Sequence, residues 1–336
     1  MPLVGVLGAA AGLGLVVTWA CRALALRTGA VCHPRHDRWS ITPVPLLGGP
    51  AIVITTTVLL LFVPGLPRVV WVLMAGAASL AIVGLIDDLR PLSPRVKLTA
   101  QLAAAIAVTA MGLRFPLTGI PWLDIAITVG WLVGLSNAFN LIDNMDGLAA
   151  GIAVITGGVK LVLFVMEENW PGAGAAAAFV GACLGFLSLN FHPARIFMGD
   201  SGSLFLGFFV AGLSTIGGVP NSRATMSVLI GPVAIMLVPI LDTVLVMVMR
   251  LIAGRPILQG GRDHASHRLL TAGLSIRRAV LTLYGVALVS GAVAIVTRTA
   301  SRSVSFALLA ALAVAMAALG VALARINVEE DDSLEG

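Results

Sequence analysis

Residues 70–86 read VWVLMAGAASLAIVGLI, a run of 17 residues without a single charge that ends directly in Asp87 and Asp88. The run is continuously apolar and does not alternate, which predicts a helix that crosses lipid and excludes a strand of a transmembrane barrel. The whole chain of 336 residues is 58% hydrophobic and 11% charged. Soluble domains are about 25% charged. A soluble enzyme, a disordered chain and a disulfide scaffold are therefore excluded.

The same kind of apolar run recurs along the whole chain. The eleven runs span residues 3–22, 49–66, 70–86, 97–113, 121–139, 148–166, 172–189, 203–219, 225–249, 278–297 and 304–325. We therefore expect an all-α polytopic membrane protein with about eleven transmembrane helices. Residues 1–336 are expected to form a single integral membrane transferase domain, in which residues 326–336 are an acidic cytoplasmic tail.

The basic residues predict the orientation of these helices. Most of the 21 Lys and Arg residues fall in loops on one side if all eleven runs cross the membrane. The positive-inside rule places that side in the cytoplasm, which puts the N-terminus outside and the C-terminus inside a plasma (inner) membrane. The net charge of +5 is explained by this arrangement, so we expect no nucleic-acid partner. The three cysteines form no CxxC pair and indicate neither a disulfide framework nor a zinc site.

Charged groups at the predicted cytoplasmic helix ends form the first candidate site. Asp87 and Asp88 end one apolar run, and Lys97 begins the next. Carboxylates so close to hydrocarbon are costly and usually functional. One of them is suited to take a proton from an acceptor phosphate or to help hold a metal, and Lys97 lies where a phosphate head group is expected. The alternative is a solvated helix end.

A second polar group follows the run at 121–139. Asn140, Asp143 and Asp146 are three residues apart and would share one face of a helix. That face would suit a metal-bound phosphate or a polar ligand ring. The alternative is a turn with Asx caps.

Asp200 stands between two glycines, Gly199 and Gly202, just before an apolar run. A hard oxygen ligand beside exposed N–H groups suits a magnesium-bound diphosphate, and the alternative is a structural N-cap. In the last polar loop His264 and His267 are flanked by arginines, a composition that favours a polyphosphate or a sugar. A zinc site and a basic loop that only fixes topology are the alternatives.

Two charges fall inside apolar runs. Asp242 either pairs with another helix or reaches the site, because the run around it contains prolines. Lys160 is predicted to snorkel toward the outer interface near Glu167 and Glu168.

Together these motifs resemble the polyprenyl-phosphate N-acetylhexosamine-1-phosphate transferases, the membrane family of the WecA-like and TagO-like enzymes and of phospho-N-acetylmuramoyl-pentapeptide translocase. The resemblance covers nearly the whole chain and rests on four motifs in order: the Asp87-Asp88 pair, Asn140-x-x-Asp143-x-x-Asp146, FMGDSGS at 197–203, and the loop 263–268. That loop looks more like the WecA-like form, although Ser266 stands where another histidine is often found.

The resemblance implies transfer of a sugar-1-phosphate from a UDP-sugar to a polyprenyl phosphate such as undecaprenyl phosphate, with release of UMP. The product would begin a cell-envelope glycan. UDP-N-acetylglucosamine is the first choice of donor, and UDP-MurNAc-pentapeptide is the alternative. The implied cofactor is Mg²⁺, with Mn²⁺ as a substitute, and a homodimer is expected from the family alone.

The resemblance also implies roles for individual residues. The catalytic set would be Asp87, Asp88, Lys97 and Asp200, in which Asp87 or Asp88 acts on the acceptor phosphate. Mg²⁺ would be held by Asp200 and Asp143. The substrate-binding set would be Asn140, Asp143, Asp146, Asn190, Phe197, His264, His267 and Arg268, with Asn190 and Phe197 near the uracil.

Two other classes of protein compete with this interpretation. A transporter would gather its polar residues near the middle of the membrane, whereas here they cluster at helix ends. A non-catalytic scaffold would have no reason to collect carboxylates, amides and histidines on one face. Direct displacement is favoured over an aspartyl-phosphate intermediate, although the sequence does not decide between them.

Overall fold

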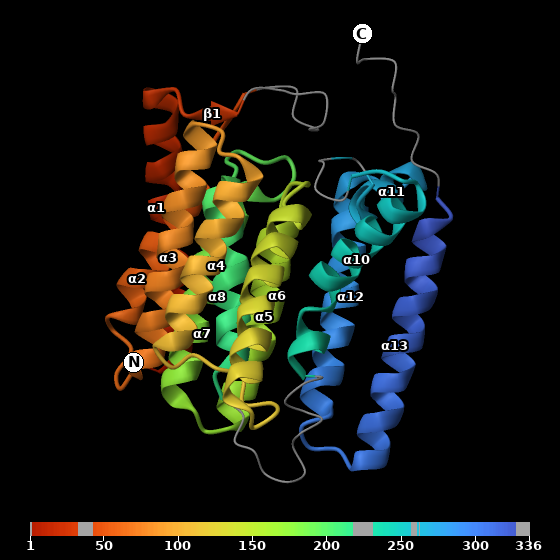
Figure 1. Cartoon of the computed structure of the whole chain (residues 1–336). Helices are drawn as coiled ribbons and strands as arrows, with labels where there is room; N and C mark the ends of the chain where they lie inside the picture. Colours follow the sequence, from red (N-terminus) through yellow and green to blue (C-terminus); the bar gives the residue numbers. More distant parts are fainter. Residues whose placement is uncertain (1, 33–42, 218–230, 257–260, 262, 327–336) are drawn as a thin grey trace.

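The computed structural model describes residues 2–32, 43–217, 231–256, 261 and 263–326. Most of these residues lie in helices, and most of the helices run roughly parallel or antiparallel to one another (Figure 1). The helices are α1 (Leu3–Thr28), α2 (Gly48–Leu60), α3 (Arg68–Leu89), α4 (Pro94–Ala110), α5 (Pro121–Ile142), α6 (Leu148–Met166), α7 (Trp170–Asn190), α8 (Gly199–Thr215), α10 (Leu237–Ile252), α11 (Ala265–Thr271), α12 (Ile276–Val296) and α13 (Arg302–Ala324). Two short strands, β1 (Val31–Cys32) and β2 (Val44–Pro45), form an antiparallel pair.

Each of the eleven predicted apolar runs overlaps one of these helices. Within the described residues, seven helices are long and apolar enough to cross a membrane, namely α1, α3, α5, α6, α7, α12 and α13. The others are shorter, with 13 residues in α2, 17 in α4, 17 in α8 and 16 in α10. The chain is therefore an all-α, multi-pass membrane protein, as predicted. Of the predicted acidic tail, residues 327–336 lie outside the described part of the chain.

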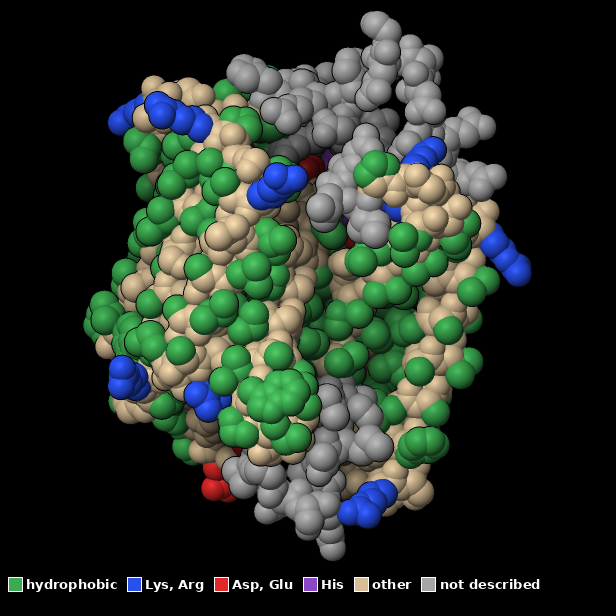
Figure 2. Space-filling view, viewed as in Figure 1, with side chains coloured by type: hydrophobic (Ala, Val, Ile, Leu, Met, Phe, Trp, Pro, Cys, Tyr) green, Lys and Arg blue, Asp and Glu red, His purple; other side chains and the backbone are tan. Residues whose placement is uncertain are grey.

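The helices alternate in direction along the bundle. In Figure 1, α1 begins at the lower end and α13 finishes at the upper end. The upper end is where α3, α5 and α7 finish and where α4, α6 and α8 begin, so it gathers the four motifs of the sequence. Apolar side chains cover the middle of the face in Figure 2, and Lys and Arg lie toward both ends. This distribution fits a bundle that sits in lipid.

Small residues let the helices in the centre of the bundle approach closely. In α7, a Cβ atom on Gly181 would lie 2.4 Å from the Cβ of Ala10 in α1, so only glycine fits at this crossing. Phe179, Phe205 and Phe209 fill the space between α7 and α8, with ring centroids 5.1 to 6.3 Å apart. The result is a rigid centre, from which α8 projects Asp200 at the upper end.

Candidate active site

Three helices bring one lysine between two carboxylates at the upper end. The Nζ atom of Lys97, in the first turn of α4, lies 3.0 Å from Oδ2 of Asp87 and 2.8 Å from Oδ2 of Asp200. Asp87 comes from the last turn of α3, and Asp200 from the first turn of α8. The side chains of Lys97, Asp87 and Asp200 are 25%, 14% and 25% exposed, so a ligand has access to them. The three groups carry a net charge of −1.

Asp88 faces a different partner from that of Asp87. Its two carboxylate oxygens accept hydrogen bonds from the backbone N–H groups of Asp200, at 2.8 Å, and Ser201, at 3.1 Å. These donors belong to the first turn of α8, where backbone N–H groups have no acceptor within the helix. Asp88 therefore caps α8 from a neighbouring helix. The predicted structural N-cap therefore exists, but its carboxylate comes from Asp88 and not from Asp200.

Two glycines make this contact sterically possible. Gly199 has a φ of +67°, and a Cβ atom there would lie 2.4 Å from Oδ2 of Asp88. On α3, a Cβ atom on Gly84 would lie 2.4 Å from the carbonyl carbon of Asp200. The end of α3 thus lies directly on the backbone at the start of α8. This packing fixes Asp200 relative to Asp87 and Lys97.

The second motif leaves the helix before its last acidic residue. Asn140 is in α5 and donates a hydrogen bond from Nδ2 to Oγ of Ser203 at 2.9 Å, which joins α5 to α8. The helix ends at Ile142, Asp143 is its C-cap, and Asp146 lies in the turn that follows. The prediction that all three residues share one helical face is wrong, because the backbone turns after Ile142. A turn at this position was the alternative interpretation.

Asp146 connects that turn to the loop between α7 and α8. Its Oδ2 atom lies 2.8 Å from Nδ1 of His192 and accepts a hydrogen bond from the backbone N–H of Ala194 at 3.0 Å. The carbonyl of His192 in turn accepts a hydrogen bond from Nε of Arg277 at 3.2 Å. The turn and the loop are therefore held in one arrangement by a carboxylate that bridges them.

Asn190 has a structural position next to the site. It is buried, its Oδ1 accepts a hydrogen bond from the N–H of Gly147 at 3.1 Å, and its Nδ2 donates to the carbonyl of Ile196 at 2.9 Å. The amide is thus engaged at both ends within the protein. Phe197, which was predicted beside it, is half-buried, and its backbone N–H donates to the carbonyl of Pro45 at 2.8 Å.

The last polar loop is organised by buried acidic groups. The Oδ2 atom of Asp242, in α10, lies 2.8 Å from Nδ1 of His264. Its Oδ1 atom accepts a hydrogen bond from the backbone N–H of Ala265 at 2.7 Å. Asp242 therefore caps α11. Of the two possibilities that the sequence left open for this residue, this is the pairing with another helix. The ring centroids of His264 and His267 are 6.1 Å apart. Oγ of Ser266 donates to Oδ1 of Asn144 at 2.7 Å, which attaches this loop to the turn after α5.

The structure places Arg268 away from the carboxylate cluster. Its guanidinium donates from Nη1 to the carbonyls of Leu323, at 3.1 Å, and Ile326, at 2.7 Å, and it is 4% exposed. These are carbonyls at the C-terminal end of α13, where a cation complements the helix dipole. In this structure Arg268 is thus engaged with the end of α13, against which α11 packs, and its predicted contact with substrate stays a prediction.

An arginine also controls the charge of this loop. Nε and Nη2 of Arg250 each donate a 2.7 Å hydrogen bond to the carboxylate of Asp263. Burial acts to raise the pKa of Asp263, but the hydrogen bonds and the positive charge of Arg250 outweigh it and hold that pKa below its usual value. Asp263 is therefore ionised at neutral pH and fixes the start of the loop.

Comparison with known proteins agrees with this geometry. The model of glycosyl transferase family 4 matches residues 70–218. A probable undecaprenyl-phosphate N-acetylglucosaminyl 1-phosphate transferase of Bacillus subtilis is 35% identical over 85% of this chain and 82% of its own length. The chain belongs to the polyprenyl-phosphate N-acetylhexosamine-1-phosphate transferase family.

Two further relatives of this transferase are named for different activities. A decaprenyl-phosphate N-acetylglucosaminephosphotransferase of Mycolicibacterium smegmatis is 38% identical over 78% of this chain and 74% of its own length. A phospho-N-acetylmuramoyl-pentapeptide-transferase of Desulforudis audaxviator is 32% identical over 74% of this chain and 82% of its own length. The relatives thus share the phosphosugar transfer and differ in the sugar.

The carboxylates of this transferase fit a metal that is shared with a substrate. Among the described residues, no group of three or more His, Cys, Asp and Glu side chains is arranged to enclose an ion. Mg²⁺ is usually bound by one or two carboxylates together with substrate phosphates, and an all-protein cage is uncommon. Asp200, one of the two residues expected to hold Mg²⁺, provides a hard oxygen ligand of that kind at a partly exposed position.

Sequence reasoning missed several residues that shape the site. Ser203 lies inside the motif at 197–203, but its contact with Asn140 is known only from the packing, as is the contact of His192 with Asp146. Tyr284 in α12 donates from its hydroxyl to the carbonyl of Gly147 at 2.5 Å. It is the one tyrosine in the chain, and this rarity is the only feature of the sequence that could have drawn attention to it.

Proposed function

We propose that this protein transfers N-acetylglucosamine-1-phosphate from UDP-N-acetylglucosamine to undecaprenyl phosphate or another polyprenyl phosphate, and releases UMP. The observation that carries the proposal is the cluster in which Lys97 bridges Asp87 and Asp200, at the ends of three helices. The activities for which the relatives are named support the acceptor and the sugar. This reaction would be the first membrane step of cell-envelope glycan synthesis.

Within this cluster Asp87 is the group that acts on the acceptor. Asp88 is committed to two backbone N–H groups of α8, whereas Asp87 faces Lys97 at a partly exposed position. An acceptor phosphate that enters here meets the Lys97 ammonium, and Asp87 takes its remaining proton if it has one. Asp88 acts as a positioning residue, because it fixes the start of α8 and with it Asp200.

The reaction is a direct displacement in this proposal. An oxygen of the acceptor phosphate forms a bond with the phosphorus that bears the sugar, and the bond from that phosphorus to the bridging oxygen breaks. The electron pair of the broken bond leaves on UMP. Such a transfer needs positioning and charge neutralisation more than covalent catalysis. Lys97 provides one positive charge beside the reacting phosphates.

The proposed cofactor is Mg²⁺, which Mn²⁺ can replace. Asp200 and Asp143 would hold it together with the diphosphate of the donor, and when bound it neutralises the charge that develops on the leaving phosphate. Asn140 and Asp146, at the end of α5 and in the next turn, lie at the same end of the bundle and would contact the nucleotide. His264 and His267 would contact the diphosphate or the sugar.

The membrane topology completes the proposal. We place the upper end in the cytoplasm, because the basic loops lie there, with eleven crossings of the plasma membrane. The polyprenyl tail would lie between helices in the cytoplasmic leaflet. A homodimer is also proposed, and its support is the family alone.

The experiment is a measurement of UMP release by purified protein in detergent. It contains Mg²⁺, undecaprenyl phosphate and, one at a time, UDP-N-acetylglucosamine, other UDP-N-acetylhexosamines and UDP-MurNAc-pentapeptide. We expect UMP only when lipid acceptor is present, with UDP-N-acetylglucosamine as the preferred donor and a strong loss of activity in Asp87→Asn. Absence of UMP with every donor, from folded protein, would overturn the proposal and favour a transporter.

A further inference from the structure

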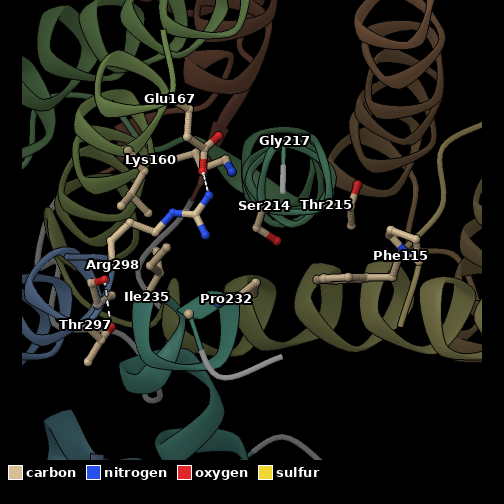
Figure 3. A pocket seen from close by; sticks show the side chains of 14 residues that line it. Phe115, Lys160, Glu167, Ser214, Thr215, Gly217, Pro232, Ile235, Thr297 and Arg298 are labelled. Atoms are coloured by element: carbon tan, nitrogen blue, oxygen red, sulfur yellow. Dashed lines mark hydrogen bonds and ion pairs between the residues drawn. The ribbon is translucent and has the colours of Figure 1, made fainter. Parts of the chain in front are cut away.

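A cavity lined by both charged and apolar residues lies at the lower end of the bundle, away from the carboxylate cluster. It is a partly open hollow between the ends of α6, α8 and α12 and the residues before α5 and α10. Figure 3 shows Lys160, Glu167 and Arg298 grouped on one wall, and Phe115 on the opposite one. The proposed transfer reaction uses none of these residues.

Lys160 is the unusual group of this cavity. It is 6% exposed in the last third of α6, and its Nζ lies 4.2 Å from the centroid of the Phe164 ring. Among the residues that the structure describes, none accepts a hydrogen bond from this ammonium group. Contact with an aromatic face offsets only part of the cost of removing an ammonium ion from water. Lys160 thus lies toward the lower end in one cavity with Glu167, but its side chain is buried there and is not exposed at the surface.

The cavity contains more positive than negative charge. Among the described residues that line it, Glu167 has the one carboxylate, and this group is paired with Nη2 of Arg298. Lys160 and Arg298 thus share a single counter-charge, and both retain N–H donors that point to no carboxylate in the described structure. A buried excess of one positive charge is stabilised when an anion with acceptor oxygens binds beside it.

The rest of the lining indicates what kind of anion fits. Leu163, Ile235 and Ala294 make part of the wall apolar, and the hydroxyl of Ser214 already donates to the carbonyl of Ala211 at 2.6 Å. The cavity thus combines cationic donors with an apolar surface near the ends of membrane helices. Cationic N–H donors pair with the phosphate of a lipid head group, and an apolar wall beside them suits the adjoining hydrocarbon.

We propose that this cavity binds a phosphate-bearing anion, with Lys160 and Arg298 as its cationic ligands. The chemistry is shared by the head group of an anionic phospholipid and by free inorganic phosphate. Bound there, the anion contacts α6 and α12 on one side and α8 on the other. It therefore stabilises the packing of α12 against the rest of the bundle.

The test measures thermal unfolding of delipidated protein in detergent, followed by the fluorescence of its six tryptophans. Phosphatidylglycerol, phosphatidylcholine or inorganic phosphate is added at increasing concentration. The variants are Lys160→Met and Arg298→Gln, and the matched control is Arg68→Gln, an exposed arginine at the same end of the bundle. Lys160→Met removes a buried charge, so without lipid it should unfold at the same temperature as wild type or higher.

We expect phosphatidylglycerol to raise the unfolding temperature of wild type and of Arg68→Gln more than phosphatidylcholine does. Its apparent affinity should fall at least about tenfold in Lys160→Met and in Arg298→Gln. If inorganic phosphate gives the same gain and the same loss, the anion is free phosphate. No gain in wild type, an equal gain with phosphatidylcholine, or an undiminished gain in both cavity variants would overturn the proposal. Because catalysis is not the readout, the result is independent of the proposed transferase activity.

Discussion

The two ends of the bundle each contain a lysine, but its surroundings are opposite in sign. At the upper end, Lys97 lies between the carboxylates of Asp87 and Asp200, and the group is partly exposed. At the lower end, Lys160 is buried in the cavity that Arg298 also lines, and Glu167 has the one carboxylate in the described part of that lining. The upper cluster therefore favours a cation together with phosphates, and the lower one favours an anion. The function of a lysine in a membrane bundle is thus decided by the charges around it and by its burial.

Removal of divalent metal should have the largest effect and should separate the two ends. We expect EDTA to abolish UMP release, because Asp200 and its neighbours would then face the donor diphosphate without charge neutralisation. Added Mg²⁺ should restore activity, and Mn²⁺ should do so in part. The response of the unfolding temperature to phosphatidylglycerol should be unchanged by EDTA. UMP release that persists after exhaustive chelation would refute the metal-dependent mechanism.

Asp200→Asn should reduce kcat for UMP release at least about 100-fold, a loss typical of removing one group that stabilises transition-state charge. The side chain keeps its size and its place at the start of α8, so folding should be retained. The control is Glu168→Gln, an exposed carboxylate at the lower end, which should turn over like wild type. Equal losses in both variants would mean that the charge effect is not specific to the upper cluster.

Arg268→Gln should act on stability, because the structure joins Arg268 to the end of α13. Losing hydrogen bonds from a buried cation to helix carbonyls should lower the free energy of unfolding by about 2 kcal/mol. Thermal unfolding checks this, while KM for UDP-N-acetylglucosamine, measured where the variant is folded, should stay near the wild-type value. A raised KM with unchanged stability would instead support the substrate contact predicted from the sequence.

Asp88→Ala tests the capping contact within the upper cluster and should have the smallest effect on stability. It removes the acceptors of two backbone N–H groups of α8, which should cost about 1 kcal/mol of unfolding free energy. Asp88→Asn retains one acceptor oxygen and should lose less. If the alanine variant is as stable as wild type, Asp88 is not the cap of α8.

The helices were predictable because continuous apolar runs have one structural solution in lipid. The roles of Asp88 and Arg268 were not predictable, because their partners are the start of α8 and the end of α13, far away in the sequence. Lys160 was placed at the interface because α6 is apolar on all sides, so its sequence does not reveal which side faces protein and which faces lipid. The four motifs could be assigned to one end from the loops, but their hydrogen-bonded connections depend on tertiary packing.

The most direct test compares the only two lysines of the chain in one assay. UMP release from UDP-N-acetylglucosamine, with undecaprenyl phosphate and Mg²⁺, is measured for wild type, Lys97→Met and Lys160→Met. We predict that Lys97→Met loses at least about 100-fold in kcat, because the charge next to the reacting phosphates is gone. The kcat of Lys160→Met should stay within about twofold of the wild-type value. Lys160 is remote from the reacting phosphates and so does not stabilise the charge of the transition state. Wild-type turnover in Lys97→Met, or no UMP from the wild-type protein, would contradict the assignment of the upper cluster as the active site.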